Sequence, residues 1–186
     1  MNTPKINKSK LLHTGKVASK AIEILCWAGV ALMLMAAIAA MIDTSWATLN
    51  LMPDSGISMN GITMELNQGS DQITLSAIVA MLLGCGFCLA LTALVFRNLH
   101  AVLKASQSGS PFQPENVKRI ETIGWLSIAS PVAALVVTVL CKLLGGPDEM
   151  EFSLNLSGIF MGILVLILSQ FFAHGVELEQ DVDGLV

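Results

Sequence analysis

The chain has few charged residues and no tyrosine. Only 13% of its 186 residues are charged, whereas a soluble domain carries about 25%. So few charges cannot cover a soluble surface, and a hydrophobic content of 54% places the chain among membrane proteins. Its net charge of −4 argues against nucleic-acid binding driven by bulk electrostatics, so we expect no direct nucleic-acid partner. The low aromatic content leaves little material for an aromatic-lined ligand pocket.

Catalytic and metal-binding patterns are also missing. The three histidines, His13, His100 and His174, show no metal-ligand spacing, and no nucleophile with a partner base can be assigned. We therefore predict a protein without catalytic activity, cofactor or bound metal. No acidic or basic group lies deep in an apolar run, which disfavours proton-coupled transport. Glu23 comes nearest, and Lys20, one turn before it, predicts an ion pair at the membrane edge.

Four long apolar runs are present, and each approaches or exceeds the roughly 18–20 residues that a helix needs to cross a bilayer. Inside hydrocarbon a single segment satisfies its own backbone only as a helix. We therefore predict an all-α membrane protein, with one membrane domain over residues 1–186 that forms a four-helix transmembrane bundle. The predicted spans are residues 21–42, 73–96, 123–141 and 156–173.

Lysine and arginine predict the orientation of these spans, since basic residues collect on the cytoplasmic side. They lie in residues 1–20 and 97–122, whereas the segments 43–72 and 142–155 hold only Lys142. The basic arm (1–20), an elbow (97–122) and an acidic tail (174–186) should thus be cytoplasmic, with both termini. The main predicted role of the arm is to set topology, and contact with anionic lipid of the bilayer is the alternative.

The outer segments show strand patterns. Asn60-Gly61 stands between alternating apolar residues, which is typical of a two-residue hairpin turn. This turn predicts a hairpin over residues 57–66, in which Met59 pairs with Ile62 and Ile57 pairs with Met64. Residues 150–154 repeat the alternation and should add a third strand, because an isolated hairpin is marginal in water. We predict a small extracytoplasmic three-stranded cap; the alternative is a plain linker.

Small residues within the spans predict close helix packing. Cys85 and Cys88 form a C-x-x-C pair, but inside hydrocarbon a thiolate is disfavoured, so packing is favoured over redox chemistry. Gly158 and Gly162 form a G-x-x-x-G pattern that permits a close crossing, within the bundle or across a homodimer. Pro131 should kink its helix.

The elbow has the sequence pattern of a helix N-terminus. Pro114 suits the first helical position, which makes Gln113 the N-cap. Phe112 could then form a hydrophobic staple with Val117. Glu115 lies in the first turn, where its charge matches the helix dipole. An Arg119 pair with Glu115 is expected from the i,i+4 spacing; a pair with the tail would instead join elbow and tail.

Two segments resemble the signature of a known family. The elbow "GSPFQPENVKRIETIGW" and the tail "HGVELEQDVDGLV" are similar to the hallmarks of domain-of-unknown-function family 2975, although Gln113 stands where Thr is more usual. The resemblance implies a small protein of the bacterial cytoplasmic (inner) membrane, whose gene often neighbours a short helix-turn-helix regulator, and no established activity. The signature positions are Gly109, Pro111, Phe112, Glu115, Asn116 and Arg119 in the elbow, and Gly175, Glu177, Leu178 and Asp181 in the tail.

Two functions are consistent with these features. The first is a regulatory, sensory or interaction protein, whose acidic tail binds a basic cytoplasmic partner such as the helix-turn-helix regulator; the tail could equally be solvated or pair with the basic arm. The alternative is a small transporter or channel that acts as a dimer. It requires a continuous polar path lined by Thr92, Ser127, Ser130, Thr138 and Ser169. A membrane enzyme comes third, for want of a nucleophile or metal set.

Overall fold

The computed structural model describes residues 8–43, 57–59, 62–64, 74–108, 112–145, 150–152 and 156–183. Its four helices are α1 (Lys8–Ile42), α3 (Leu75–Ser108), α4 (Pro114–Leu143) and α5 (Leu156–Asp183). All four are long and apolar enough to cross a membrane, which confirms the predicted four helices. At about 1.5 Å per residue they are longer than the ~30 Å hydrocarbon core, so each continues beyond its apolar run.

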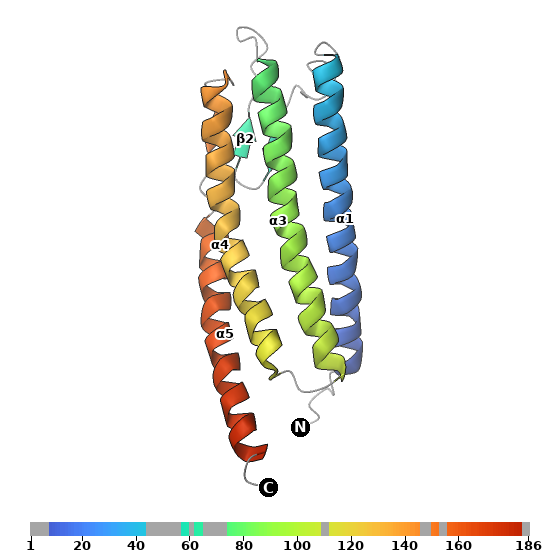
Figure 1. Cartoon of the computed structure of the whole chain (residues 1–186), viewed down its shortest axis with the longest axis vertical. Helices are drawn as coiled ribbons and strands as arrows, with labels where there is room; N and C mark the ends of the chain where they lie inside the picture. Colours follow the sequence, from blue (N-terminus) through green and yellow to red (C-terminus); the bar gives the residue numbers. More distant parts are fainter. Residues whose placement is uncertain are drawn as a thin grey trace, which may run out of the picture.

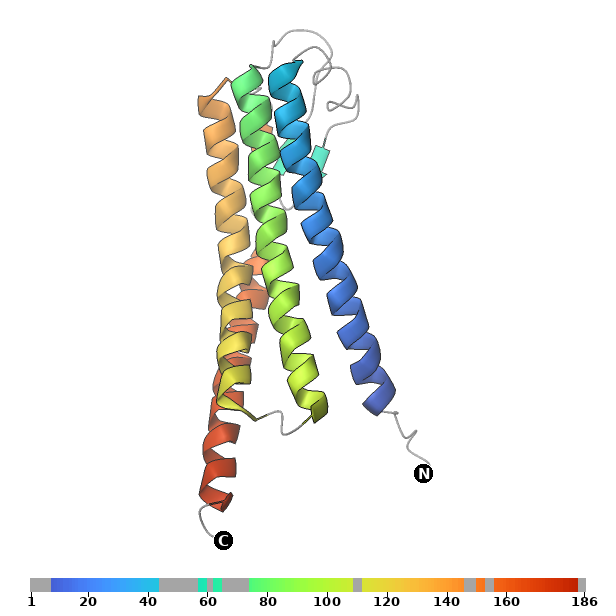
Figure 2. The same cartoon turned by 45° about the vertical axis from the view of Figure 1, so that its right-hand side comes forward.

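The helices pack in chain order. The main contacts join α1 to α3, α3 to α4 and α4 to α5, and among the described residues no other helix pair makes a comparable contact. The start of α1, the end of α3, the start of α4 and the end of α5 lie at one end of the molecule (Figures 1 and 2). The bundle is therefore an up-and-down row with α1 and α5 at its edges. Much of its apolar surface remains exposed, as expected for a protein embedded in lipid.

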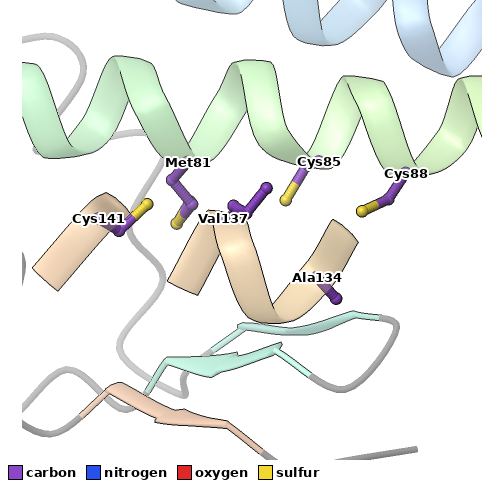
Figure 3. Packing of buried hydrophobic residues seen from close by; sticks show 6 residues of the cluster. All are labelled: Met81, Cys85, Cys88, Ala134, Val137 and Cys141. Carbon is purple, nitrogen blue, oxygen red and sulfur yellow. The ribbon is translucent and has the colours of Figure 1, made fainter. Parts of the chain in front are cut away.

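Small side chains bring α3 and α4 together. A Cβ placed on Gly84 would lie 2.2 Å from Cγ1 of Val137, so only glycine fits there. Around this contact lies a cluster that Figure 3 shows, with Met81, Cys85 and Cys88 on α3 facing Ala134, Val137 and Cys141 on α4. Cys26, Cys85, Cys88 and Cys141 are free thiols, and three of them serve as small apolar groups in this interface, as predicted.

The crossing of α4 and α5 also depends on glycine. A Cβ on Gly162 would lie 2.5 Å from Cγ1 of Ile128 and 2.8 Å from the carbonyl oxygen of Gly124. Gly158 of α5 lies beside Ser127 and Pro131 of α4. Of the two interpretations of the G-x-x-x-G pattern, the structure shows the crossing within the bundle.

A small sheet lies beside α4. Strands β1 (Ile57–Met59), β2 (Ile62–Met64) and β3 (Met150–Phe152) form an antiparallel sheet in the order β1-β2-β3. Its hairpin pairs Ile57 with Met64 and Met59 with Ile62, which is the register that the alternating pattern predicts; the turn Asn60-Gly61 lies outside the described residues.

The predicted cap at the end of the bundle is not supported. Strands β2 and β3 contact α4, and α4 lies between α3 and the sheet (Figure 3). The physical reason is the offset of α5. Its first turn, at Gly158, meets the middle of α4, at Pro131, so α5 leaves the far half of α4 uncovered on that side. The sheet occupies part of this space.

Hydrogen bonds join neighbouring helices at both ends of the bundle. At one end, Thr74 before α3 donates its hydroxyl to the carbonyl of Leu144 after α4, and Ser76 donates to the same carbonyl at 3.1 Å. Gly145 follows with φ +83°, a backbone geometry that favours glycine. At the other end, Lys16 of α1 donates to the Gln107 side chain at 3.2 Å. The Nδ1 atom of His100 lies 3.0 Å from the Lys16 carbonyl oxygen.

Gly162→Ala should destabilise the protein, because its methyl group has no room between Ile128 and the Gly124 carbonyl. Overpacking of this kind costs about 1–3 kcal/mol, which exceeds the gain of roughly 1 kcal/mol in helix propensity. We expect a lower temperature of thermal unfolding in detergent. Gly86→Ala is the matched control, since its Cβ would meet only Met33 Cβ at 3.5 Å. Equal unfolding temperatures for the two variants would contradict the crossing.

Candidate functional site

The elbow forms the helix start that the sequence predicts. Gln113 is the N-cap of α4, with φ −105° and ψ 140°, and Pro114 begins the helix. The Gln113 carbonyl accepts hydrogen bonds from the amides of Asn116 and Val117, at 2.9 and 3.2 Å. Its side chain makes no capping hydrogen bond, so Gln113 itself contributes to the cap only through its backbone carbonyl. The staple of Phe112 with Val117 stays a prediction.

Arg119 forms a local ion pair. Its guanidinium lies 3.5 Å from the Glu115 carboxylate, and the two side chains are 34% and 80% exposed. Such an exposed i,i+4 pair contributes only a few tenths of a kcal/mol. Of the two partners that the sequence allows for Arg119, the structure shows Glu115 of the elbow and, among the described residues, not an acid of the tail.

Elbow and tail are nevertheless in contact, through Phe112. The Phe112 ring lies against Phe172 of α5, with 5.5 Å between the ring centroids. A Cβ on Gly175 would lie only 2.6 Å from the Phe112 ring, so the absence of a side chain at Gly175 makes room for the ring. Phe112 belongs to the elbow signature and Gly175 to the tail signature. The two segments that carry the family resemblance thus meet at one point of the structure.

Buried residues continue this contact along α4 and α5. Asn116 is 1% exposed and Ile120 is 7% exposed. They lie eight and four residues before Gly124, on nearly the same side of α4. On α5, Ser169 and Val176 are buried. The elbow is therefore a packed part of the bundle and not a loose connection.

Beyond Val176, α5 continues as a helix whose Glu177 and Leu178 side chains are exposed. Figure 1 shows it extending past the start of α4. Glu177 is 70% exposed and lies 3.1 Å from Nδ1 of His174 on the same helix, and Leu178 is 60% exposed. The acidic tail is thus helical through Asp183. The side chain of Asp181, and the predicted site residues Gly109 and Pro111, lie outside the described residues.

A pocket of about 200 Å³ lies between α3, α4 and α5. Thr92, Ser127 and Ser130 all line it. Thr138 and Ser169, which a transport path would also need, do not line it; they are buried and donate to the carbonyls of Ala134 and Leu166. The five polar side chains therefore do not form one continuous path.

A further ion pair lies in the first half of α1. Glu23 is buried and pairs with Lys20 at 2.9 Å, the local pair expected from their spacing. Within the described part of the chain, no three His, Cys, Asp or Glu side chains are close enough together to hold a metal ion.

Four apolar helices packed in this way define a multi-pass integral membrane protein. The particular family follows from the sequence, because the model of a family described as protein of unknown function, DUF2975, matches residues 27–186. The match covers most of the chain, which therefore belongs to this family, as its elbow and tail signatures predict. No curated protein and no solved structure matches the chain significantly.

Substitutions at Gly175 and Phe112 should be strongly coupled. Gly175→Ala alone forces the Phe112 ring to move and should lower the unfolding temperature. In a Phe112→Leu background the same change should be neutral or stabilising, because alanine favours the helix by about 1 kcal/mol. A double-mutant cycle measured by thermal unfolding should give an interaction energy of roughly 0.5–3 kcal/mol. Additive effects would show that ring and glycine do not touch.

Proposed function

We propose that the protein is a non-catalytic regulatory or interaction component of the bacterial cytoplasmic membrane. The observation that carries this proposal is the contact of Phe112 with Gly175. It joins the elbow and the tail helix into one ordered surface at the end of the bundle. Such a surface has a fixed geometry that a partner can recognise, whereas a loose acidic tail offers only unselective charge.

The basic residues of the arm and elbow support a cytoplasmic position for this surface. Its exposed part combines charge with apolar area, since Glu177 and Leu178 are both more than half exposed. The tail sequence carries Glu177, Glu179, Asp181 and Asp183, so a partner of complementary charge is basic. A helix-turn-helix regulator, which the family resemblance implies as a gene neighbour, has this character.

Transport or channel activity is the second candidate. The pocket beside Thr92, Ser127 and Ser130 favours it, whereas the positions of Thr138 and Ser169 do not. A dimer for that activity needs a surface other than Gly158 and Gly162, because α4 of the same chain already packs against both glycines.

Charge reversal in the tail tests the first proposal. Tagged protein with Glu177→Lys and Glu179→Lys would be purified from native membranes beside the unchanged chain. Co-purifying proteins would be quantified by mass spectrometry. We expect a basic cytoplasmic protein to be lost from the variant, because like charges facing each other cost several kcal/mol.

Asp43→Lys is the matched control, since Asp43 is an exposed acid directly after α1, at the end of the bundle opposite to the tail, and it should leave the recovered partner unchanged. Equal recovery of the same proteins with the reversed tail would contradict docking at this surface.

A further inference from the structure

The pocket between α3, α4 and α5 lies deep in the membrane-spanning part of the chain. Thr92 and Ser127 are near the middle of α3 and α4, and Gly158 and Met161 line the pocket from the first turns of α5. All of these positions fall within the apolar runs of their helices. Because the pocket is only partly enclosed, a ligand can reach it from the surrounding hydrocarbon.

Pro131 leaves a carbonyl oxygen in this pocket without its helical donor. Proline has no amide hydrogen, so the carbonyl of the residue four positions earlier loses its intrahelical bond. In α4 that residue is Ser127. Its carbonyl oxygen lies 3.6 Å from the position that a Cβ would take on Gly158. Both Ser127 and Gly158 line the pocket, so the oxygen faces the part of α5 that carries no side chain.

Two hydroxyl groups that line the pocket already donate their hydrogens within their own helices. Ser127 donates its hydroxyl hydrogen to the Ile123 carbonyl at 2.8 Å, and Thr92 donates to the Cys88 carbonyl at 3.0 Å. Their oxygen lone pairs can still accept. A ligand that supplies one hydrogen-bond donor therefore complements these groups, and a purely hydrocarbon ligand does not.

The size of the pocket limits the apolar part of the ligand. Its volume of about 200 Å³ exceeds that of an engineered cavity of roughly 150 Å³ that binds benzene. A ring or a short alkyl segment therefore fits, between Met161 and Pro131. Entry from the hydrocarbon requires a neutral molecule, because charge is costly at this depth.

We propose that this pocket binds a lipid-soluble alcohol or phenol, whose hydroxyl donates a hydrogen bond to the Ser127 carbonyl and whose apolar body lies between α4 and α5. Residues of α3, α4 and α5 line this pocket. The site therefore does not depend on the proposed binding of a partner to the elbow and tail. The ligand is defined by one neutral donor on a compact apolar body.

A photoreactive pair of probes tests this site. Full-length protein in lipid nanodiscs would be labelled with a diazirine derivative of octanol and with its methyl ether, which lacks the donor. Mass spectrometry would locate the labels. We expect the alcohol to label the pocket residues, competed by 1-octanol, about three- to tenfold more than the ether does, the range that one net hydrogen bond supports.

Three variants sharpen the result. Gly158→Ala places a methyl group at ordinary contact distances of 3.6–3.8 Å from Ser127 and Pro131, so it should narrow the pocket without unfolding the protein. Pro131→Ala restores the amide that binds the Ser127 carbonyl. Both should reduce labelling by the alcohol severalfold, whereas Gly86→Ala, in the α1–α3 contact, should not.

Each contrary outcome overturns a defined part of the proposal. Equal labelling by alcohol and ether would exclude recognition of the donor. Uniform labelling over all lipid-facing residues would mean that only acyl chains fill the pocket. If Gly158→Ala folds normally and labels like the unchanged chain, the site lies elsewhere.

Discussion

The packing of α5 against α4 is the constraint on which the functional features depend. Gly158 meets Pro131 at the start of α5, Gly162 meets Ile128 and the Gly124 carbonyl along it, and Gly175 receives the Phe112 ring near its end. The close crossing fixes the offset between the two helices. That offset brings Phe112 to Gly175, opens the pocket beside Ser127 and leaves room for the sheet next to α4. One helix contact therefore positions the joined elbow and tail, the pocket between the helices and the sheet.

The lipid environment explains why glycine dominates this contact. Hydrocarbon chains are as apolar as leucine, so transmembrane helices gain little from burying apolar area against one another, and close van der Waals packing stabilises their association. Gly84 against Val137 follows the same rule on the other side of α4. Because α4 packs against α3 on one side and against the edge helix α5 on the other, it is one of the two inner helices of the row.

The sequence predicts the local structure well and the tertiary contacts poorly. Apolar length gives the four helices, Pro114 gives the start of α4, and strict alternation around residues 60–61 gives the strand register, since each depends on neighbours in the chain. The place of the sheet could not be predicted, because it follows from where α5 starts against α4. The signal for the Phe112–Gly175 contact was a glycine and a ring in two separate signatures, and nothing in their spacing pairs them.

The most direct test is a disulfide between elbow and tail. In a chain whose four native cysteines are replaced by alanine, Phe112→Cys and Gly175→Cys would be oxidised in membranes, and the linked peptides identified by mass spectrometry. The contact predicts a cross-link within one chain, because a Cβ on Gly175 would lie 3.4 Å from Cγ of Phe112, the position that the sulfur of a cysteine at 112 can take. Glu177 lies on the same helix as Gly175 but faces away, so the pair Phe112→Cys with Glu177→Cys should form little disulfide. Equal cross-linking of both pairs, or none for the first, would contradict a fixed junction of elbow and tail.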